Sequence, residues 1–157
     1  MVLESNFLPM ATRGIRNNNP LNIRIGNKWL GEVAQPTDKD FEQFVSMAYG
    51  IRAALIILRR YMTRYHLNTI YDIVSRWAPK VENNVDQYAK FVSEKMNKSV
   101  IIPLEFSNRE DVVKLVCAMA LYETGTAIDA QLVREVYCKI LWDDKPESYN
   151  ELEKVTY

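Results

Sequence analysis

The spacing of apolar residues changes at about Ser46, from short irregular pieces to long helical stripes. Between Gly14 and Pro36, turn-forming residues interrupt the chain every few positions. The short apolar pieces in and just after this region read NIRI, KWLGEV and FEQFV. Because short apolar runs bounded by turn residues are typical of strands, we predict two or three short strands in a small β-hairpin lobe near the N-terminus.

Apolar residues recur at helical spacing in five later segments, which we predict as helices over 46–66, 68–78, 83–96, 107–125 and 129–141. Each segment begins with a residue suited to accept a hydrogen bond from a free helical N–H. The predicted N-caps are Ser46, Asn68 or Thr69, Asn83 or Asn84, Ser107 (with Glu110 at capping-box spacing) and Asp129. Pro79 ends the second segment, and Gly125 is the expected C-cap of the fourth.

The predicted fold class is therefore mainly α, of the α+β kind, with a helical body and a small β-hairpin lobe. A length of 157 residues is suited to one domain with a substantial core. We place this single domain at 13–142, between an N-terminal tail at 1–12 and a polar C-terminal tail at 143–157.

The amino-acid composition limits the classes of partner that the protein is expected to bind. Twenty basic residues balance twenty acidic ones, which argues against broad binding to nucleic acid and against attraction to an anionic membrane. The longest apolar runs, such as 53–58, are too short to cross a bilayer, and the first dozen residues do not resemble a secretory signal. We therefore expect no nucleic-acid partner, no membrane partner and no signal peptide.

Cysteine and histidine are scarce. Cys117 and Cys138 fall inside helical patterns, so we predict two buried free thiols, and we expect neither a metal site nor a cofactor. His66 is the single histidine, which weakens any histidine-based catalytic triad. Carboxylates are consequently the favoured acid–base groups.

Glu123 is the strongest candidate among these carboxylates, because it follows the strongly apolar run VVKLVCAMALY. Partial burial and the negative end of a helix both raise a carboxyl pKa, and a carboxyl that keeps its proton can act as a general acid. The alternative is a solvated glutamate in the last helical turn, which the pattern alone favours.

The segment RWAPKVENNVDQY, residues 76–88, joins two predicted helices at a corner. Its asparagines are expected to satisfy helix-end amides, and Trp77 is expected in the core. Glu82 remains a candidate for a second catalytic carboxylate.

The predicted lobe combines the aromatic residues Trp29 and Tyr49 with the acidic residues Asp38, Asp40 and Glu42. This mixture suits a sugar, whose apolar face stacks on aromatic rings while its hydroxyls need polar partners. An equally good interpretation is a surface hairpin in which Trp29 fills its own small core.

Four segments together resemble a family of small phage and prophage virion-associated proteins. They read RGIRNNNPLNIR, FVSMAYGIRA, RWAPKVENNVDQY and AMALYETG, and they occur in this order between Arg13 and Gly125. This chain has Leu21 where members often have glycine, and Val85 where many have a threonine that would supply a cap hydroxyl. The resemblance implies a virion component without implying a mechanism.

A second resemblance, to lysozyme-like bacterial glucosaminidases, implies a catalytic mechanism. NNPLNIR, KWLGEV and FEQFVSMAYG are similar to later pieces of those enzymes in the same order, and CAMALYETG is similar to their glutamate-bearing helix moved to the other end. Such a circular permutation is tolerable because the termini of compact domains often lie close together. It implies a lysozyme-like domain with Glu123 as general acid facing the Asn-rich loop, residues 16–24.

The resulting hypothesis is a phage or prophage enzyme that cleaves peptidoglycan glycan strands. Glu82 and Asp38 are the catalytic candidates beside Glu123. The predicted substrate-binding residues are Asn18, Asn22, Arg24, Trp29, Tyr49 and Trp77. We expect the protein in the virion, or in the host cytoplasm before release, and acting at the cell wall. The rival is a structural virion or tail component that keeps the fold and whose contact with glycan, where it occurs, is binding without cleavage. The expected partners are peptidoglycan glycan strands, with other virion proteins as further candidates.

Overall fold

The computed structural model describes residues 11–78 and 84–143, and its regular structure is helical. The helices are α1 (Arg13–Arg16), α2 (Met47–Thr63), α3 (Ile70–Trp77), α4 (Val85–Met96), α5 (Arg109–Thr124) and α6 (Ala130–Asp143). The mainly α fold class is thus confirmed. None of the helices in these ranges has the length and apolarity that crossing a membrane requires.

Most predicted helix ends are confirmed by their hydrogen bonds. The side-chain oxygens of Ser46, Thr69 and Asn84 each accept from the backbone N–H three residues later. Gly125 ends α5 with φ 71°, the left-handed conformation in which glycine meets no steric penalty. Asp129 precedes α6, and its Oδ1 accepts from the backbone N–H of Gln131 at 2.9 Å.

Two predicted ends were wrong. Asn108, not Ser107, caps α5 by accepting from the Asp111 N–H at 3.2 Å. The capping box does not form because the Glu110 carboxylate pairs instead with Arg134 of α6 at 3.0 Å. Helix α2 ends at Thr63, which leaves Tyr65 51% exposed outside the helical face.

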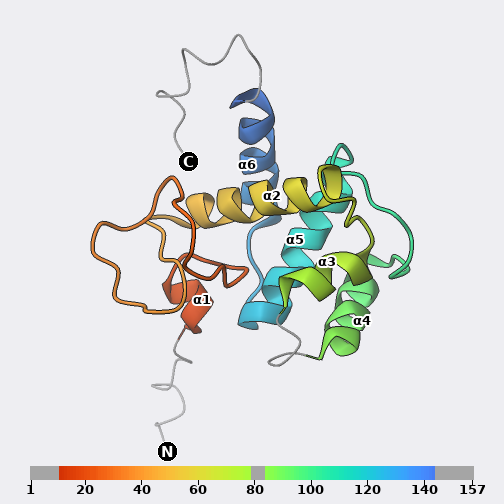
Figure 1. Cartoon of the computed structure of the whole chain (residues 1–157), viewed down its shortest axis with the longest axis horizontal. Helices are drawn as coiled ribbons and strands as arrows, with labels where there is room; N and C mark the ends of the chain where they lie inside the picture. Colours follow the sequence, from red (N-terminus) through yellow and green to blue (C-terminus); the bar gives the residue numbers. More distant parts are fainter. Residues whose placement is uncertain (1–10, 79–83, 144–157) are drawn as a thin grey trace, which may run out of the picture.

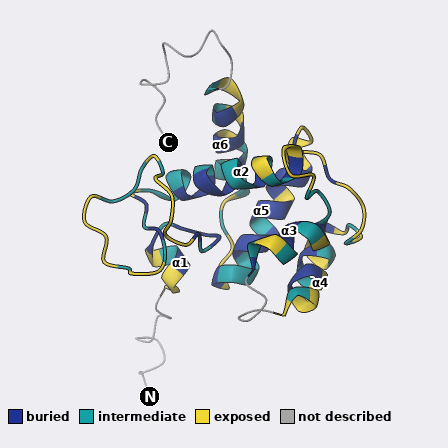
Figure 2. Cartoon of the chain, in the orientation of Figure 1, coloured by how far each residue is buried: buried dark blue, intermediate teal, exposed yellow. Residues whose placement is uncertain are grey.

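Helix α5 is the centre of the core. It packs against α4, α6 and α1, while α2 crosses α6 and contacts α3. Leu115, Val116 and Met119 are completely buried along it. Much of α5 has the colours of buried and intermediate residues in Figure 2. At its C-terminal end the Tyr122 ring stacks on Tyr88 of α4 with centroids 3.9 Å apart. Burial on nearly every side explains why this helix reads as continuously apolar rather than amphipathic.

The predicted hairpin strands were wrong for the described residues. The lobe between α1 and α2 contains only two isolated antiparallel bridges, Arg24 with Phe41 and Glu32 with Phe44. Backbone hydrogen bonds such as that from the Glu42 N–H to the Ile23 carbonyl oxygen (2.9 Å) accompany the bridges, and side chains add to them: the Gln43 Oε1 accepts from the backbone N–H groups of Thr37 (2.6 Å) and Asp38 (3.1 Å). The lobe forms one end of the molecule, and α3 and α4 form the other (Figure 1).

The two cysteines are free thiols, as predicted, but they are not both buried. Cys117 is half-buried on α5 and Cys138 is exposed on α6. Helical periodicity does not distinguish a position at the edge of the buried face from one at its centre, which is why the predicted burial failed.

Glycine allows α2 to begin directly against the lobe. A Cβ on Gly50 would lie 1.9 Å from the carbonyl oxygen of Asn18, a contact that only movement of the backbone can relieve. The first turn of α2 and the Asn-rich loop are therefore in backbone contact.

The substitution Gly50→Ala should lower the free energy of unfolding by about 3 kcal/mol or more, because overpacking against backbone leaves no side chain to move aside. Gly26→Ala is the matched control, since a Cβ there meets nothing within 4 Å and the expected change is below about 0.5 kcal/mol. Urea unfolding of the two variants measures the difference. Equal stability of both would contradict the close approach.

Candidate active site around Glu123

The Asn-rich loop is held by two buried asparagine side chains. Asn19 is completely buried; its Nδ2 donates to the carbonyl oxygens of Ile23 and Glu42, and its Oδ1 accepts from the Ile23 N–H at 2.9 Å. The Asn17 Nδ2 donates to Asp38 at 2.9 Å, and its Oδ1 accepts from Gln43 at 3.1 Å. These bonds fix the loop in place of regular secondary structure.

Asn18 and Asn22 both adopt φ 52°, in the left-handed region that asparagine tolerates better than other non-glycine residues. Their side chains then point to different places. The Asn18 Nδ2 donates to the carbonyl oxygen of Phe44 at 3.0 Å. The Asn22 Nδ2 lies 3.3 Å from the Glu123 carbonyl oxygen and 3.3 Å from its Oε1.

Glu123 lies in the last turn of α5 between this loop and α4. Its Oε2 accepts from the Tyr88 hydroxyl at 3.1 Å, while Oε1 faces Asn22. Burial raises the pKa of the Glu123 carboxyl, and the hydrogen bonds from Asn22 and Tyr88 offset part of that rise. The predicted proximity of Glu123 to the Asn-rich loop is thus present, with a partly buried carboxyl.

A second contact joins the start of the domain to the same end of α5. The Thr12 hydroxyl donates to the carbonyl oxygen of Thr124 at 2.9 Å. A Cβ on Gly14 would lie within 3 Å of both the Asn22 Oδ1 and the Thr124 Cγ2. Helix α1 therefore packs tightly against the residues on either side of the Asn22–Glu123 pair.

The Asn22 Oδ1 is buried and has no hydrogen-bond partner among the described residues. The Nδ2 of the same amide donates to Glu123, and this bond favours the ionised form of the carboxyl, against the effect of burial.

Asp38 is occupied by contacts within the lobe. It forms a bidentate pair with Arg13 at 2.5 and 2.6 Å and also accepts from Asn17 and from the backbone N–H groups of Asp40 and Phe41. The Arg13 guanidinium holds the pKa of this carboxyl well below its usual range. Such a carboxylate does not release or take up a proton near neutral pH, so its geometry is that of an anchor for the lobe.

The other predicted site residues lie in several places. Glu82 is outside the described residues. The Arg24 guanidinium lies over the Phe41 ring, 4.9 Å from its centroid, and the half-buried Tyr49 ring lies against Gly31. Trp29 is half-buried against the core, and the Trp77 Nε1 donates to the Leu21 carbonyl oxygen at 2.9 Å. Of the predicted binding residues, Asn22 is the one that contacts Glu123.

The lobe also contains a carboxyl pair that the sequence pattern did not predict. Glu42, 6% exposed, is hydrogen-bonded to Glu32, and burial together with the neighbouring charge raises the pKa of Glu42 to about 7. The Glu32 Oε1 also accepts from the Trp29 N–H at 2.9 Å. This pair stabilises the lobe when it shares a proton.

Tyr88 is the functional residue that sequence analysis missed. It belongs to the apolar stripe of α4 and is completely buried, so periodicity identifies it only as core. Its hydroxyl position depends on how α4 packs on α5, which no local pattern encodes.

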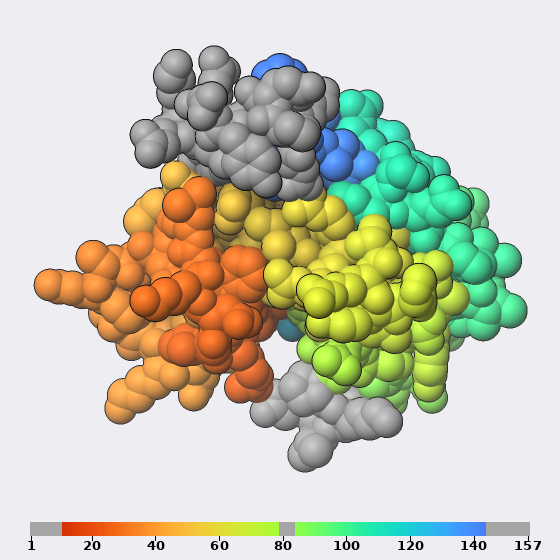
Figure 3. Space-filling view, turned by 45° about the horizontal axis from the view of Figure 1, so that its top comes forward, coloured from red at the N-terminus to blue at the C-terminus, as the bar shows by residue number. Residues whose placement is uncertain are grey.

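On the face seen in Figure 3, the lobe (orange) and α3 (yellow-green) lie side by side with a narrow depression between them.

Comparison with known proteins gives one informative relative. The chain is 41% identical over 120 residues to Protein P5 of Pseudoalteromonas phage PM2, an alignment that covers 74% of this chain and 73% of that protein. The chain belongs to the Protein P5 family. The prediction that the chain belongs to a phage protein family is therefore confirmed. No family model matches the chain.

The name of the relative states no biochemical activity, and the chemistry that the site around Glu123 can perform follows from its own residues. Within the described residues, no group of three or more histidine, cysteine, aspartate or glutamate side chains is placed to hold a metal ion. The arrangement around Glu123 offers instead a single half-buried acid with two hydrogen-bond donors.

Because the Tyr88 hydroxyl donates to the ionised form of Glu123, the substitution Tyr88→Phe should raise the pKa of that carboxyl further. Carbon-13 NMR titration of the glutamate side chains measures the shift directly. Tyr122→Phe is the matched control, since that ring stacks on Tyr88 and donates no bond to Glu123 in the structure. An unchanged Glu123 pKa in Tyr88→Phe would contradict the hydrogen bond.

The shared proton of Glu42 makes the lobe sensitive to pH. Its pKa is raised from 4.5 to about 7, so the folded state binds more protons than the unfolded state in this window. The free energy of unfolding should therefore fall as the pH rises from about 4.5 to about 7. Glu42→Gln should flatten that dependence, and Glu32→Gln should move it to lower pH because the repelling charge is gone. Parallel slopes in wild type and Glu42→Gln would contradict the assignment.

Proposed function

We propose that this phage protein cleaves peptidoglycan glycan strands, with Glu123 as the general acid. The observation that carries the proposal is the half-buried Glu123 carboxyl at the junction of the Asn-rich loop, α4 and α5. Its raised pKa favours the protonated form that must donate to the leaving glycosidic oxygen. The proposal covers muramidase-like and glucosaminidase-like cleavage, by hydrolysis or transglycosylation.

Each neighbour of Glu123 has a role in this chemistry. Tyr88 and Asn22 orient the carboxyl, and after proton transfer their N–H and O–H groups stabilise the resulting carboxylate. Both are neutral donors, and their hydrogen bonds offset part of the rise in the pKa of Glu123 that burial causes. A carboxyl held in one orientation transfers its proton to a leaving oxygen more efficiently than a mobile one.

The cleavage requires a second contribution at the sugar's anomeric carbon. Glu82 remains a predicted second carboxylate, whereas the ion-paired Asp38 is disfavoured by its contacts with Arg13 and Asn17. An N-acetyl sugar also supplies its own acetamido oxygen, so one protein acid is sufficient in substrate-assisted enzymes. A neutral acid and substrate assistance together account for the chemistry.

The substrate is proposed to lie between the lobe and α3. Asn18, Asn22, Arg24, Trp29, Tyr49 and Trp77 remain the predicted binding residues. Trp29, Tyr49 and Trp77 are half-buried aromatic residues, a type that stacks on the apolar face of a sugar, and Arg24 carries an exposed guanidinium of the kind that binds hydroxyl or carboxylate groups. The expected partners are therefore glycan strands and other virion proteins, with no role for nucleic acid or membrane. In this proposal the protein travels in the virion, or waits in the host cytoplasm before release, and acts at the cell wall.

One observation favours a second candidate, a virion or tail component without catalytic activity. Asn22 is placed between the side chain and the backbone carbonyl of Glu123, so the pair also joins the loop to the end of α5. A bridge of this kind stabilises a fold whether or not a reaction takes place. In that case Glu123 is retained for structure, and any glycan contact is binding alone.

The substitution Glu123→Gln separates the two candidates. For an enzyme, the release of soluble fragments from purified peptidoglycan should fall by about 100-fold or more, because glutamine has no proton to donate. Muropeptide release followed by liquid chromatography measures the rate. Release by wild type that the glutamine variant matches would contradict the role of Glu123.

Two controls accompany this assay. Glu94→Gln removes an exposed carboxylate from α4 and should leave release unchanged. Thermal unfolding of Glu123→Gln checks that the fold is kept, since the glutamine retains the size of the side chain and an acceptor for Asn22. If wild type releases nothing, the structural candidate replaces the enzymatic one.

A further inference from the structure

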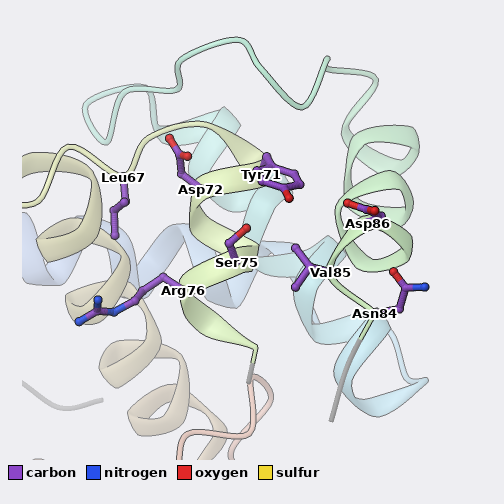
Figure 4. Close-up of a pocket in the computed structure, with 8 residues that line it drawn as sticks. All are labelled: Leu67, Tyr71, Asp72, Ser75, Arg76, Asn84, Val85 and Asp86. Carbon is purple, nitrogen blue, oxygen red and sulfur yellow. The ribbon is translucent and has the colours of Figure 1, made fainter. Parts of the chain in front are cut away.

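The corner between α3 and α4 contains a hollow that the proposed reaction at Glu123 does not use. It has a volume of about 530 Å³, within the range of roughly 300–1,000 Å³ that ligand sites occupy. Its walls come from the outer face of α3 and from the first residues of α4 (Figure 4). Both walls belong to the segment 67–86, which includes the described ends of the RWAPKVENNVDQY motif.

Charges are placed at both ends of the hollow. Asp72 and Arg76 of α3 lie on one side of the view in Figure 4, and Asp86 of α4 lies on the other. In the described part of the chain, neither carboxylate forms an ion pair with a basic side chain. Arg76 hydrogen-bonds the Tyr61 hydroxyl, a neutral partner. Two carboxylates and one guanidinium favour a ligand that has both an ammonium and a carboxylate.

The floor of the hollow supplies an independent indication. The Ser75 Oγ is buried and has no hydrogen-bond partner among the described residues, although a helical serine commonly bonds the carbonyl four residues earlier. A buried hydroxyl without a partner carries a desolvation cost that a bound polar group removes. Tyr71 and Val85 lie beside it and provide apolar surface for methylene groups (Figure 4).

We propose that this hollow binds the peptide stem of a peptidoglycan strand, in particular a stem residue bearing a side-chain ammonium and a carboxylate. This inference rests on the proposed function. The uncrosslinked stem carries both charges, whereas the N-acetylated sugars carry no positive charge that Asp72 or Asp86 would select. The ammonium lies between the two aspartates, the carboxylate meets Arg76, and a peptide amide pairs with Ser75.

Helix α4 links this hollow to the acid. Val85 and Asp86 line the hollow at the start of α4, and Tyr88, which holds Glu123, follows within one turn. Both sites are therefore built partly on the first turn of α4, which carries the hollow on its exposed side and Tyr88 on its buried side. In this proposal, cleavage depends on the presence of stems.

A titration with the isolated stem tripeptide, L-alanyl-D-glutamyl-diaminopimelate, tests binding without requiring cleavage. In the full-length protein, amide resonances of Ser75, Arg76 and Asp86 should shift on addition of the tripeptide, and Asp72→Asn together with Asp86→Asn should weaken binding about ten-fold or more. Glu94→Gln should bind as wild type does. N-acetylglucosamine oligomers without stems should not shift these resonances; if they do while the tripeptide does not, the hollow is a sugar site and the inference is overturned.

A second assay compares cleavage of strands that carry stems with strands stripped by an amidase. Wild type should cut the stem-bearing strands about ten-fold faster, and the double asparagine variant should lose most of that preference. Equal rates in wild type, or a preference that survives in the variant, overturn the inference while leaving Glu123 as the acid. If wild type cuts neither substrate, the proposed function fails, and the tripeptide titration alone decides the hollow.

Discussion

The contact between Asn22 and Glu123 is the constraint on which the site depends. It joins residues 101 positions apart, and both lie at points where regular structure stops. Each is held from its own side: Asn22 by a left-handed backbone turn in a loop fixed by buried amides, and Glu123 by the last turn of a buried helix. A carboxyl held between two rigid elements has little contact with water, and that loss of solvation raises its pKa.

The helices were predictable because their information is local. Apolar spacing fixes which face of α2 or α4 is buried, and Ser46, Thr69 and Asn84 begin their helices through bonds three residues away. The start of α5 was predicted wrongly because it depends on a contact with another helix, which local sequence does not contain. Whether Ser107 or Asn108 caps that helix depends on Glu110, which is drawn to Arg134 on a different helix. A capping box read from the sequence does not include that competitor.

The site was only partly predictable, for the same reason. The acidic residue and the Asn-rich loop stand out in the sequence, and their resemblance to two families brought them together. The partners that set the electrostatics do not stand out, because Tyr88 reads as core and Asp38 reads as a free acid. Tyr88 donates to Glu123, and Arg13 neutralises Asp38, through contacts made only after α1, α4 and the lobe have packed.

The amide-fixed lobe has a consequence for association between molecules. A hairpin of regular strands presents a row of unpaired N–H and C=O groups at its edge, which invites another strand to extend it. In this lobe, isolated bridges stand in place of a regular ladder, and the side chains of Asn18, Asn19 and Gln43 bond further backbone groups. The described lobe thus offers a neighbouring copy no continuous edge to join. This arrangement gives the protein a face that resists fibrous self-association, even where many copies lie close together.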